Sequence, residues 1–182
     1  MTLPQTRTLH WPDEAACAAS ATALAAAMRA AFSNRAGLHD AFIELHGPLG
    51  AGKTTFVRHL LRALGVQGRV KSPTYAVLEE YDVPWPNDGD AASFDIRHFD
   101  FYRFNDPQEW EDAGFRDVFA RPGLKLAEWP EKAAGLLPAP DLRITIEPGI
   151  DADSDERRAV HISALSALGA KLLGSLGADL PG

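Results

Sequence analysis

The fold of this chain is decided by the stretch His46-Gly47-Pro48-Leu49-Gly50-Ala51-Gly52-Lys53-Thr54-Thr55. From Gly47 to Thr54 it matches G-x-x-x-x-G-K-S/T, the pattern of a phosphate-binding loop, at every position. A short apolar run, Ala41–Leu45, precedes the loop, and Thr55–Leu64 follows it with apolar residues at helical spacing. The sequence therefore predicts a strand, a glycine loop and a helix, the order in which this motif binds phosphate.

The residue types of the loop predict a nucleoside triphosphate and Mg²⁺ as ligands. Glycines let the chain turn tightly, so that backbone N–H groups point at the phosphates, and the following helix N-terminus adds a partial positive charge. Lys53 can reach the β- and γ-phosphates, and the Thr54 hydroxyl can bind a Mg²⁺ ion that bridges them. The residues expected to bind ATP are Gly47, Leu49, Gly50, Ala51, Gly52, Lys53, Thr54 and Thr55.

The composition indicates a globular protein of the cytoplasm. Its 182 residues suit one domain, which we expect to span residues 1–182. The formal net charge of −7 argues against a protein that grips DNA or RNA by itself. Cys17 is the only cysteine, which excludes an internal disulfide, and Thr2–His10 lacks the apolar run of a signal peptide. The alanine-rich stretch Ala15–Ala31 predicts a packed helix, with no membrane span.

The remaining patterns predict an α/β domain of the P-loop NTPase kind, with a mixed sheet and flanking helices. The sheet is expected to be parallel near the loop and antiparallel toward the C-terminal end, where two strands flank an acidic turn. Strands are expected at Ala76–Tyr81, Phe94–Tyr102, Leu124–Glu128, Leu142–Ile146 and Ala159–Ile162, with Leu124–Glu128 central. Helices are expected from Pro12 to about Phe32, from Asp106, and at Phe115–Ala120 and Leu165–Leu173. Residues 84–93 predict an exposed hairpin loop, and residues 164–182 a helix with a frayed tail.

Two acids compete for the metal-binding role that a phosphate loop requires of a neighbouring strand. In open α/β sheets such acids lie at the carboxyl end of a strand, and Asp100 and Glu128 each end a predicted strand. We expect Asp100 to bind the metal together with Thr54, and Glu128 to orient the attacking water or share the metal. His98 is expected to be a satisfied strand histidine, and Arg103 could bind phosphate or form a structural ion pair.

A second loop, Lys71-Ser72-Pro73-Thr74-Tyr75, lies where small phosphate-loop switches place a nucleotide-sensing segment. Thr74 in this segment could contact Mg²⁺ or the γ-phosphate. Basic residues gather close by in the sequence, at Arg58, Arg62, Arg69 and Lys71. Such a group is usually a solvated surface, and docking to a partner is the alternative.

Four motifs occur along the chain in a fixed order: G-x-L-G-A-G-K-T-T at Gly47–Thr55, K-S-P-T-Y at Lys71–Tyr75, H-F-D-F-Y-R at His98–Arg103 and E-W-P-E at Glu128–Glu131. Together they resemble the TsaE family, also called YjeE, the small ATPases of bacterial tRNA threonylcarbamoyladenosine synthesis. The resemblance runs from about Leu9 to about Leu165. Two departures are Pro48, where family members often carry an acid, and the long segment 84–93.

The resemblance implies a single α/β domain that binds ATP and Mg²⁺ and joins TsaD and TsaB. These partners transfer a threonylcarbamoyl group to the adenosine next to the tRNA anticodon, and ATP hydrolysis would reset their complex between turnovers. The family would contact tRNA only through these partners. Carried over to this chain, the resemblance implies phosphate and metal binding by Lys53 and Thr54, a switch role for Thr74, metal binding by Asp100, a place for Glu128 at the metal or the attacking water, and Trp129 beside the nucleotide.

Two other functions stay open on the residues alone. A small-molecule kinase has this size and this loop, but residues 106–121 contain only Arg116 and Arg121 and no glycine-flanked arginine run of a kinase lid. A nucleotide-dependent scaffold would bind ATP without hydrolysing it. Because no arginine finger is evident, we expect slow hydrolysis by the isolated protein and stimulation by TsaD with TsaB.

Overall fold

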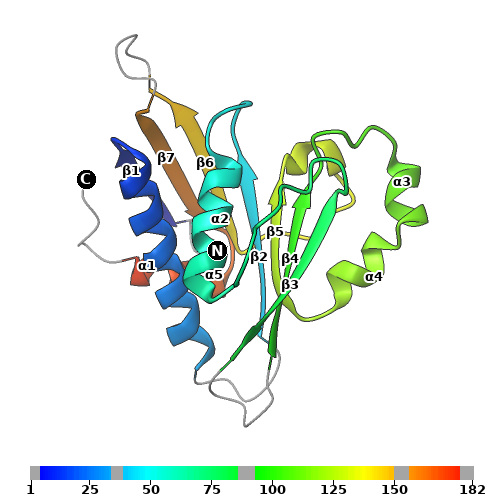
Figure 1. Cartoon of the computed structure of the whole chain (residues 1–182), viewed down its shortest axis with the longest axis horizontal. Coiled ribbons are helices and arrows are strands. Elements are labelled where there is room, and N and C mark those ends of the chain that lie inside the picture. Colours follow the sequence, from blue (N-terminus) through cyan, green and yellow to red (C-terminus); the bar gives the residue numbers. More distant parts are fainter. Residues whose placement is uncertain (1–4, 34–38, 86–92, 150–155, 177–182) are drawn as a thin grey trace.

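The computed structural model describes residues 5–33, 39–85, 93–149 and 156–176. Its centre is a seven-stranded sheet with the order β1-β7-β6-β2-β5-β4-β3 (Figure 1). The strands are β1 (Gln5–Trp11), β2 (Asp40–His46), β3 (Leu78–Pro84), β4 (Ser93–Asp100), β5 (Gly123–Glu128), β6 (Leu142–Pro148) and β7 (Arg158–Ala164). The four inner strands β6, β2, β5 and β4 are parallel, and β1, β7 and β3 pair antiparallel at the two sides. The predicted mixed α/β sheet is confirmed.

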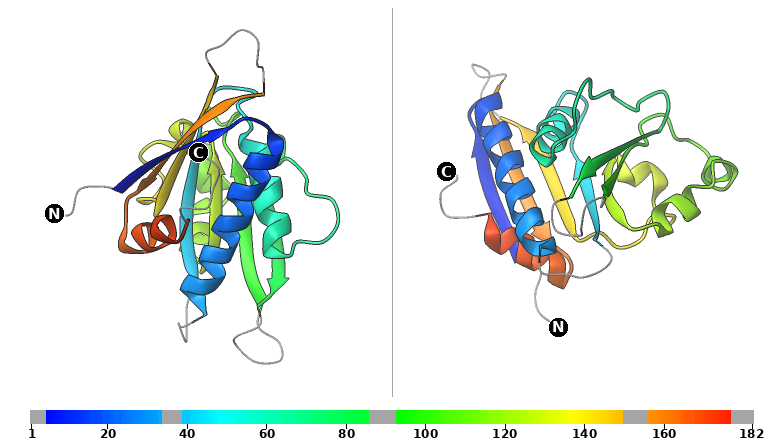
Figure 2. Two further views of the ribbon diagram at one scale, coloured as in Figure 1. Left: turned by 90° about the vertical axis from the view of Figure 1, so that its left-hand side faces the viewer. Right: turned by 60° about the horizontal axis from the view of Figure 1, so that its bottom comes forward.

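Helices cover both faces of the sheet, because its strands alternate apolar side chains between the two faces. In β2, Ile43 and Leu45 pack into one core cluster, together with α1 (Glu14–Phe32) and α2 (Lys53–Leu64). Phe42 belongs to the cluster on the opposite face. That second cluster is covered by α3 (Pro107–Asp112), α4 (Phe115–Ala120) and the 3₁₀ helix η1 (Pro130–Ala133). Figures 1 and 2 show α1 beside α2, and the pair α3 and α4 away from them.

The first helix, α1, begins where the sequence predicts. Asp13 is its N-cap, and the side chain accepts a hydrogen bond of 2.9 Å from the backbone N–H of Ala16. Among the described residues, α1 is the one helix long and apolar enough to cross a membrane, but half of it is buried inside the molecule. It packs against α2, β1 and the last helix, α5 (Ala167–Ser175). This packing is that of a core helix.

The structure corrects several local predictions. Strand β4 ends at Asp100, short of the predicted Tyr102, and α5 begins at Ala167, after the predicted Leu165. The strand expected from Ala76 begins only at Leu78, because residues 73–76 form a turn in which the Val77 N–H donates to the Pro73 carbonyl at 2.6 Å. Strand β1 was not expected, since only its residues Leu9 and Trp11 are buried. Most of the predicted hairpin loop, the acidic turn and the frayed tail fall on residues 86–92, 150–155 and 177–182, which lie outside the described residues.

Candidate nucleotide-binding site

The phosphate loop joins the carboxyl end of β2 to the first turn of α2. Gly52, in the left-handed region with φ 106°, precedes Lys53, the first residue of the helix. At Gly47, φ is 140°, and an added Cβ would lie 2.3 Å from the carbonyl oxygen of Ile146 on β6. The loop can therefore pass this close to the neighbouring strand only because glycine stands there.

Lys53 folds back over its own loop. Its Nζ donates hydrogen bonds to the carbonyls of Gly47 at 2.5 Å and Pro48 at 2.9 Å, and it lies 4.0 Å from the centre of the Trp129 ring. Burial lowers the pKa of Lys53, and the nearby carboxylates, with Glu128 the strongest, partly offset this shift. A buried ammonium held by neutral carbonyls and a ring face is well placed to receive an anion.

Glu128, at the end of β5, connects the loop to the sheet. Its Oε2 accepts a hydrogen bond of 2.8 Å from the Thr54 hydroxyl, and its Oε1 lies 2.8 Å from Nε2 of His98 on β4. Because a carboxylate can only accept, this His98 nitrogen is the donor. His98 is fully buried, and its other ring nitrogen has no hydrogen-bond partner among the described residues. Among the described residues, His98 thus forms a side-chain hydrogen bond through Nε2 alone, and the acceptor is the carboxylate of Glu128.

Asp100, at the end of β4, connects the site to the predicted switch segment. Its Oδ2 accepts a hydrogen bond of 2.7 Å from the Thr74 hydroxyl, which lies 2.8 Å from the Ser72 hydroxyl. Its Oδ1 accepts from the backbone N–H of Tyr102 at 2.9 Å. The two candidate acids are neighbours, since Asp100 and Glu128 are register partners on parallel strands. Each acid therefore holds a different threonine.

These groups line one cleft of about 250 Å³. The expected residues that line it are Leu49, Gly50, Gly52, Lys53, Thr54, Thr55, Thr74, Asp100, Glu128 and Trp129, and Tyr102, which the sequence did not single out, joins them. Gly47 and Ala51 do not line this cleft. Gly47 lies against the Ile146 carbonyl of β6, and Ala51 lines a second cavity. The structure thus brings residues from four separate motifs to one place.

The same cleft offers ligands suited to a magnesium ion. Thr54, Asp100 and Glu128 supply a hydroxyl and carboxylates, the hard oxygen donors that Mg²⁺ prefers. Among the described residues, no group of three or more His, Cys, Asp or Glu side chains could hold a metal.

Two aromatic residues at the site have unexpected features. Trp129 adopts a left-handed backbone, with φ 55° and ψ 45°, which turns the chain sharply between β5 and η1. Tyr75 is 84% exposed, and the guanidinium of Arg103 lies 4.4 Å from the centre of its ring. Arg103 therefore contacts the switch segment, an arrangement that the sequence could not distinguish from phosphate binding.

Comparisons with known proteins point to one family. Residues 11–159 match the family described as threonylcarbamoyl adenosine biosynthesis protein TsaE. The chain is 40% identical over 131 residues to the tRNA threonylcarbamoyladenosine biosynthesis protein TsaE of Haemophilus influenzae, covering 72% of this chain and 75% of that protein. It is 38% identical over 115 residues to the protein of the same name from Bacillus subtilis, covering 63% and 65%.

A solved structure agrees with the fold. The crystal structure of YdiB from Bacillus subtilis superposes with a TM-score of 0.67 and 25% sequence identity, over 97% of each chain. The family match covers all four motifs noted above and most of the chain. The chain belongs to the TsaE family of threonylcarbamoyl adenosine biosynthesis proteins.

Proposed function

We propose that this protein is a Mg²⁺-dependent ATPase that acts as a switch in tRNA threonylcarbamoyladenosine biosynthesis in the cytoplasm. The observation that carries the proposal is the contact between Thr54 of the phosphate loop and Glu128 of the adjacent strand, 2.8 Å apart. A hydroxyl and an acid in this relation are what phosphate-loop NTPases use to hold the metal of a metal–nucleotide complex. The names of the matching family and of the Haemophilus influenzae relative support the assignment to tRNA threonylcarbamoyladenosine biosynthesis.

The phosphate end of ATP would lie along the loop. Lys53 would turn from its present carbonyl partners toward the β- and γ-phosphates, and Trp129 would keep the ammonium desolvated. A bound Mg²⁺ would neutralise charge on the phosphates. The residues of this chain would position the nucleotide and the metal ion. The hydrogen-bonded pair Thr54 and Glu128 would act on one side of the cleft, and the pair Thr74 and Asp100 on the other.

The switch would consist of the segment Ser72–Tyr75. Thr74 contacts Asp100 from a turn that also carries the exposed Tyr75 ring. A γ-phosphate in the cleft would compete for the Thr74 hydroxyl, so that hydrolysis would change the position of this segment. The exposed surface of the protein around Tyr75 would then differ between the ATP-bound and ADP-bound states.

The partners would be TsaD and TsaB, and their binding surface would surround the cleft. Three large apolar side chains are exposed there: Leu49 at 73%, Tyr75 at 84% and Tyr102 at 38%. Leu49 and Tyr102 line the cleft itself, and Tyr75 belongs to the switch segment. A partner that covered these side chains would exclude water from the cleft and would sense the switch.

The experiment is a measurement of phosphate release by the pure protein, alone and with its cognate TsaD and TsaB. We expect slow release alone and clear stimulation by the two partners together. Release that stays unchanged on adding the partners would contradict the switch. Transfer of labelled phosphate to a small molecule would identify a kinase instead.

A further inference from the structure

The cleft that would receive the phosphates carries little positive charge. Among the described residues that line it, Lys53 is the single cation, and Asp100 and Glu128 are carboxylates. In the transition state of ATP hydrolysis, negative charge is spread over the oxygens of the γ-phosphoryl group, and an arginine often stabilises this charge. In this chain, such an arginine would have to come from outside the lining residues.

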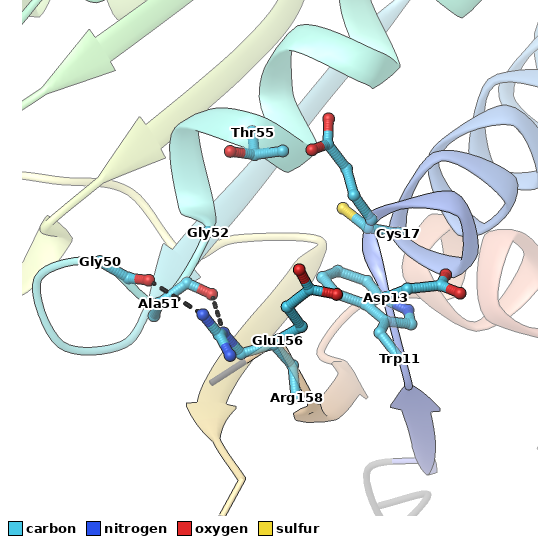
Figure 3. A pocket seen from close by; sticks show the side chains of 10 residues that line it. Trp11, Asp13, Cys17, Gly50, Ala51, Gly52, Thr55, Glu156 and Arg158 are labelled. Atoms are coloured by element: carbon cyan, nitrogen blue, oxygen red, sulfur yellow. Dashed lines mark hydrogen bonds between the residues drawn. The ribbon is translucent and has the colours of Figure 1, made fainter. Parts of the chain in front are cut away.

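Arg158 contacts the phosphate loop, but its guanidinium is already engaged. Its Nε donates a hydrogen bond to the carbonyl of Ala51 at 2.9 Å, and its Nη2 donates to the carbonyl of Gly50 at 3.4 Å. Figure 3 shows these contacts at the second cavity, which Lys53 does not line. Arg158 therefore binds the backbone of the loop in a different cavity from the ammonium that would hold the phosphates.

Arg103 lies at the corner of the turn that follows β4. The N–H of Phe104 donates to the carbonyl of Phe101 at 2.9 Å, which makes Tyr102 and Arg103 the two central residues of this turn. The side chain of Tyr102 lines the cleft, and its backbone N–H donates to Oδ1 of Asp100 at 2.9 Å. The backbone that carries Arg103 is thus fixed at the edge of the cleft.

The side chain of Arg103 reaches from this turn to the switch segment. Its guanidinium lies 4.4 Å from the centre of the Tyr75 ring, and among the described residues it forms no ion pair. Tyr75 is 84% exposed, so the contact is open to solvent, where a cation–π contact is weak. A γ-phosphate offers arginine a bidentate pair of charge-assisted hydrogen bonds, which is stronger. A bound phosphate can therefore replace the ring.

Both sides of the contact between Arg103 and Tyr75 are attached to the cleft. Thr74, which precedes Tyr75, lines the cleft and donates to Asp100 at 2.7 Å. Tyr102, which precedes Arg103, lines it too. The exchange of the ring for a phosphate therefore requires side-chain rotation at the edge of the cleft and no rearrangement of the sheet.

We propose that Arg103 is a catalytic residue of ATP hydrolysis, which the Tyr75 ring holds outside the cleft until a partner covers that ring. This inference rests on the proposed function. Water attacks the γ-phosphorus, the bond to the β–γ bridging oxygen breaks, ADP keeps the electron pair of that bond, and one proton of the water is released to solvent. Arg103 transfers no proton; its guanidinium stabilises the charge on the γ-phosphoryl oxygens.

The first measurement is phosphate release at saturating TsaD and TsaB. Arg103→Ala should lower the stimulated kcat about 100-fold or more, because an arginine in this role is worth roughly 10³–10⁵ in rate. The KM for ATP should change only a few-fold. Arg103→Lys should recover little, since an ammonium cannot form the bidentate pair. The matched control is Arg116→Ala, an exposed arginine on α4 that pairs with Glu111, and it should behave like wild type.

The second measurement is binding and needs no turnover. ADP is titrated with Mg²⁺ and aluminium fluoride, which takes the place of the γ-phosphoryl group in the transition state, in the presence of both partners. Fluoride should tighten ADP binding to the wild type about tenfold or more, as for a transition-state analogue. Arg103→Ala should lose most of this gain. Binding of ADP alone within a few-fold of wild type would show that the variant is folded.

The third measurement tests the Tyr75 ring, in the absence of partners. Tyr75→Ala should raise phosphate release several-fold because it frees the guanidinium, and the rise should vanish when Arg103→Ala is added. An unchanged stimulated kcat in Arg103→Ala, or no rise in Tyr75→Ala, would overturn the inference. A loss in Arg103→Ala that higher partner concentrations restored would mark a docking residue and would overturn it too. If the wild type released no phosphate even with both partners, the proposed function itself would fail.

Discussion

The hydroxyl of Thr54 donates a hydrogen bond of 2.8 Å to the carboxylate of Glu128, across 74 positions of sequence. Thr54 lies in the first turn of α2, and Glu128 is the last residue of β5. The parallel pairing of β2 with β5 brings the two together, since β2 leads directly into the loop. Asp100, by contrast, holds Thr74 of the switch segment.

These contacts predict separable roles for the two acids. They favour the reverse of the division that the sequence suggested, because Thr54, the threonine proposed to bind the metal, donates its hydrogen bond to Glu128. We predict that Glu128→Gln raises the Mg²⁺ concentration needed for ATP binding. Asp100→Asn should leave binding within a few-fold of wild type and reduce the response to TsaD and TsaB. ATP binding across a Mg²⁺ series, together with phosphate release, measures both effects.

The opposite result would be a higher Mg²⁺ requirement in Asp100→Asn and intact binding with slower hydrolysis in Glu128→Gln. It would support the roles that the sequence suggested, with Asp100 at the metal and Glu128 at the attacking water. Asp95→Asn is a suitable control for Asp100→Asn. Asp95 lies on the same strand and is bound by Arg97, at the other end from the cleft. It should change neither the Mg²⁺ dependence nor the stimulation by partners.

His98 is predicted to be a positioning residue for Glu128. We expect His98→Leu, which removes the hydrogen bond of 2.8 Å, to lower partner-stimulated phosphate release about tenfold or more, the equivalent of roughly 1.4 kcal/mol in the barrier. The apparent KM for ATP should change much less. His98→Gln retains an N–H donor and should recover most of the rate.

A purely structural role for His98 would give a different pattern. Both variants would then lower the free energy of unfolding alike, and Gln would not rescue the rate. The same pair of substitutions at His161, a partly exposed histidine on β7, provides the control. Neither change at His161 should affect phosphate release.

Glu44 provides a pH-dependent prediction. Burial acts to raise its pKa, but hydrogen bonds from His46 at 3.1 Å and Arg143 at 3.0 Å outweigh it, so the pKa lies below its ordinary value of 4.5. A lowered pKa in the folded state stabilises the protein above the unfolded pKa, and this contribution is lost as pH falls through the folded pKa. Glu44→Gln should therefore lower the free energy of unfolding by about 1–2 kcal/mol at pH 7.

The difference between wild type and Glu44→Gln should shrink as the pH falls below 4.5, where Glu44 gains its proton in both states. Denaturant unfolding at a series of pH values measures it. A difference that stayed constant over this range would show that the charge of Glu44 contributes nothing. Glu147→Gln, at an exposed position, is the control.

Much of the fold could be predicted because strong local patterns coincide with tertiary packing. Helix α4 has the bounds predicted for it, Phe115–Ala120, since its apolar residues follow helical spacing between Gly114 and Pro122. Strand β1 was missed because Thr6, Arg7 and Thr8 carry little apolar signal. That strand exists through pairing with β7, more than 140 residues away, and local sequence does not encode such pairing.

Most of the residues that line the cleft could be predicted, but Gly47 and Ala51 lie outside it and Tyr102 was not predicted. The contacts between the lining residues could not be predicted. The four motifs supply residues of one cleft, as their chemistry suggests. Which acid holds which threonine depends on the register of β4 against β5, and the sequence carries no direct sign of that register. The hydrogen bond between His98 and Glu128 also depends on the register of β4 against β5. A lone histidine in a strand gives no sign of its partner.

The most direct test of the account concerns Lys53, the single ammonium buried in the cleft. Its Nζ already lies against the Gly47 and Pro48 carbonyls and the Trp129 ring, so a β- or γ-phosphate would gain a charge-assisted contact there. Lys132→Ala, an exposed lysine in η1, is the matched control.

The measurement is a calorimetric titration of ATP with Mg²⁺ into wild type, Lys53→Ala and Lys132→Ala. We predict that Lys53→Ala weakens binding roughly ten- to hundredfold, as expected for the loss of about 1.5–3 kcal/mol from a hydrogen bond to a charged group. The control should bind like wild type. An unchanged ATP affinity in a folded Lys53→Ala protein would contradict the assignment of this loop as the phosphate site.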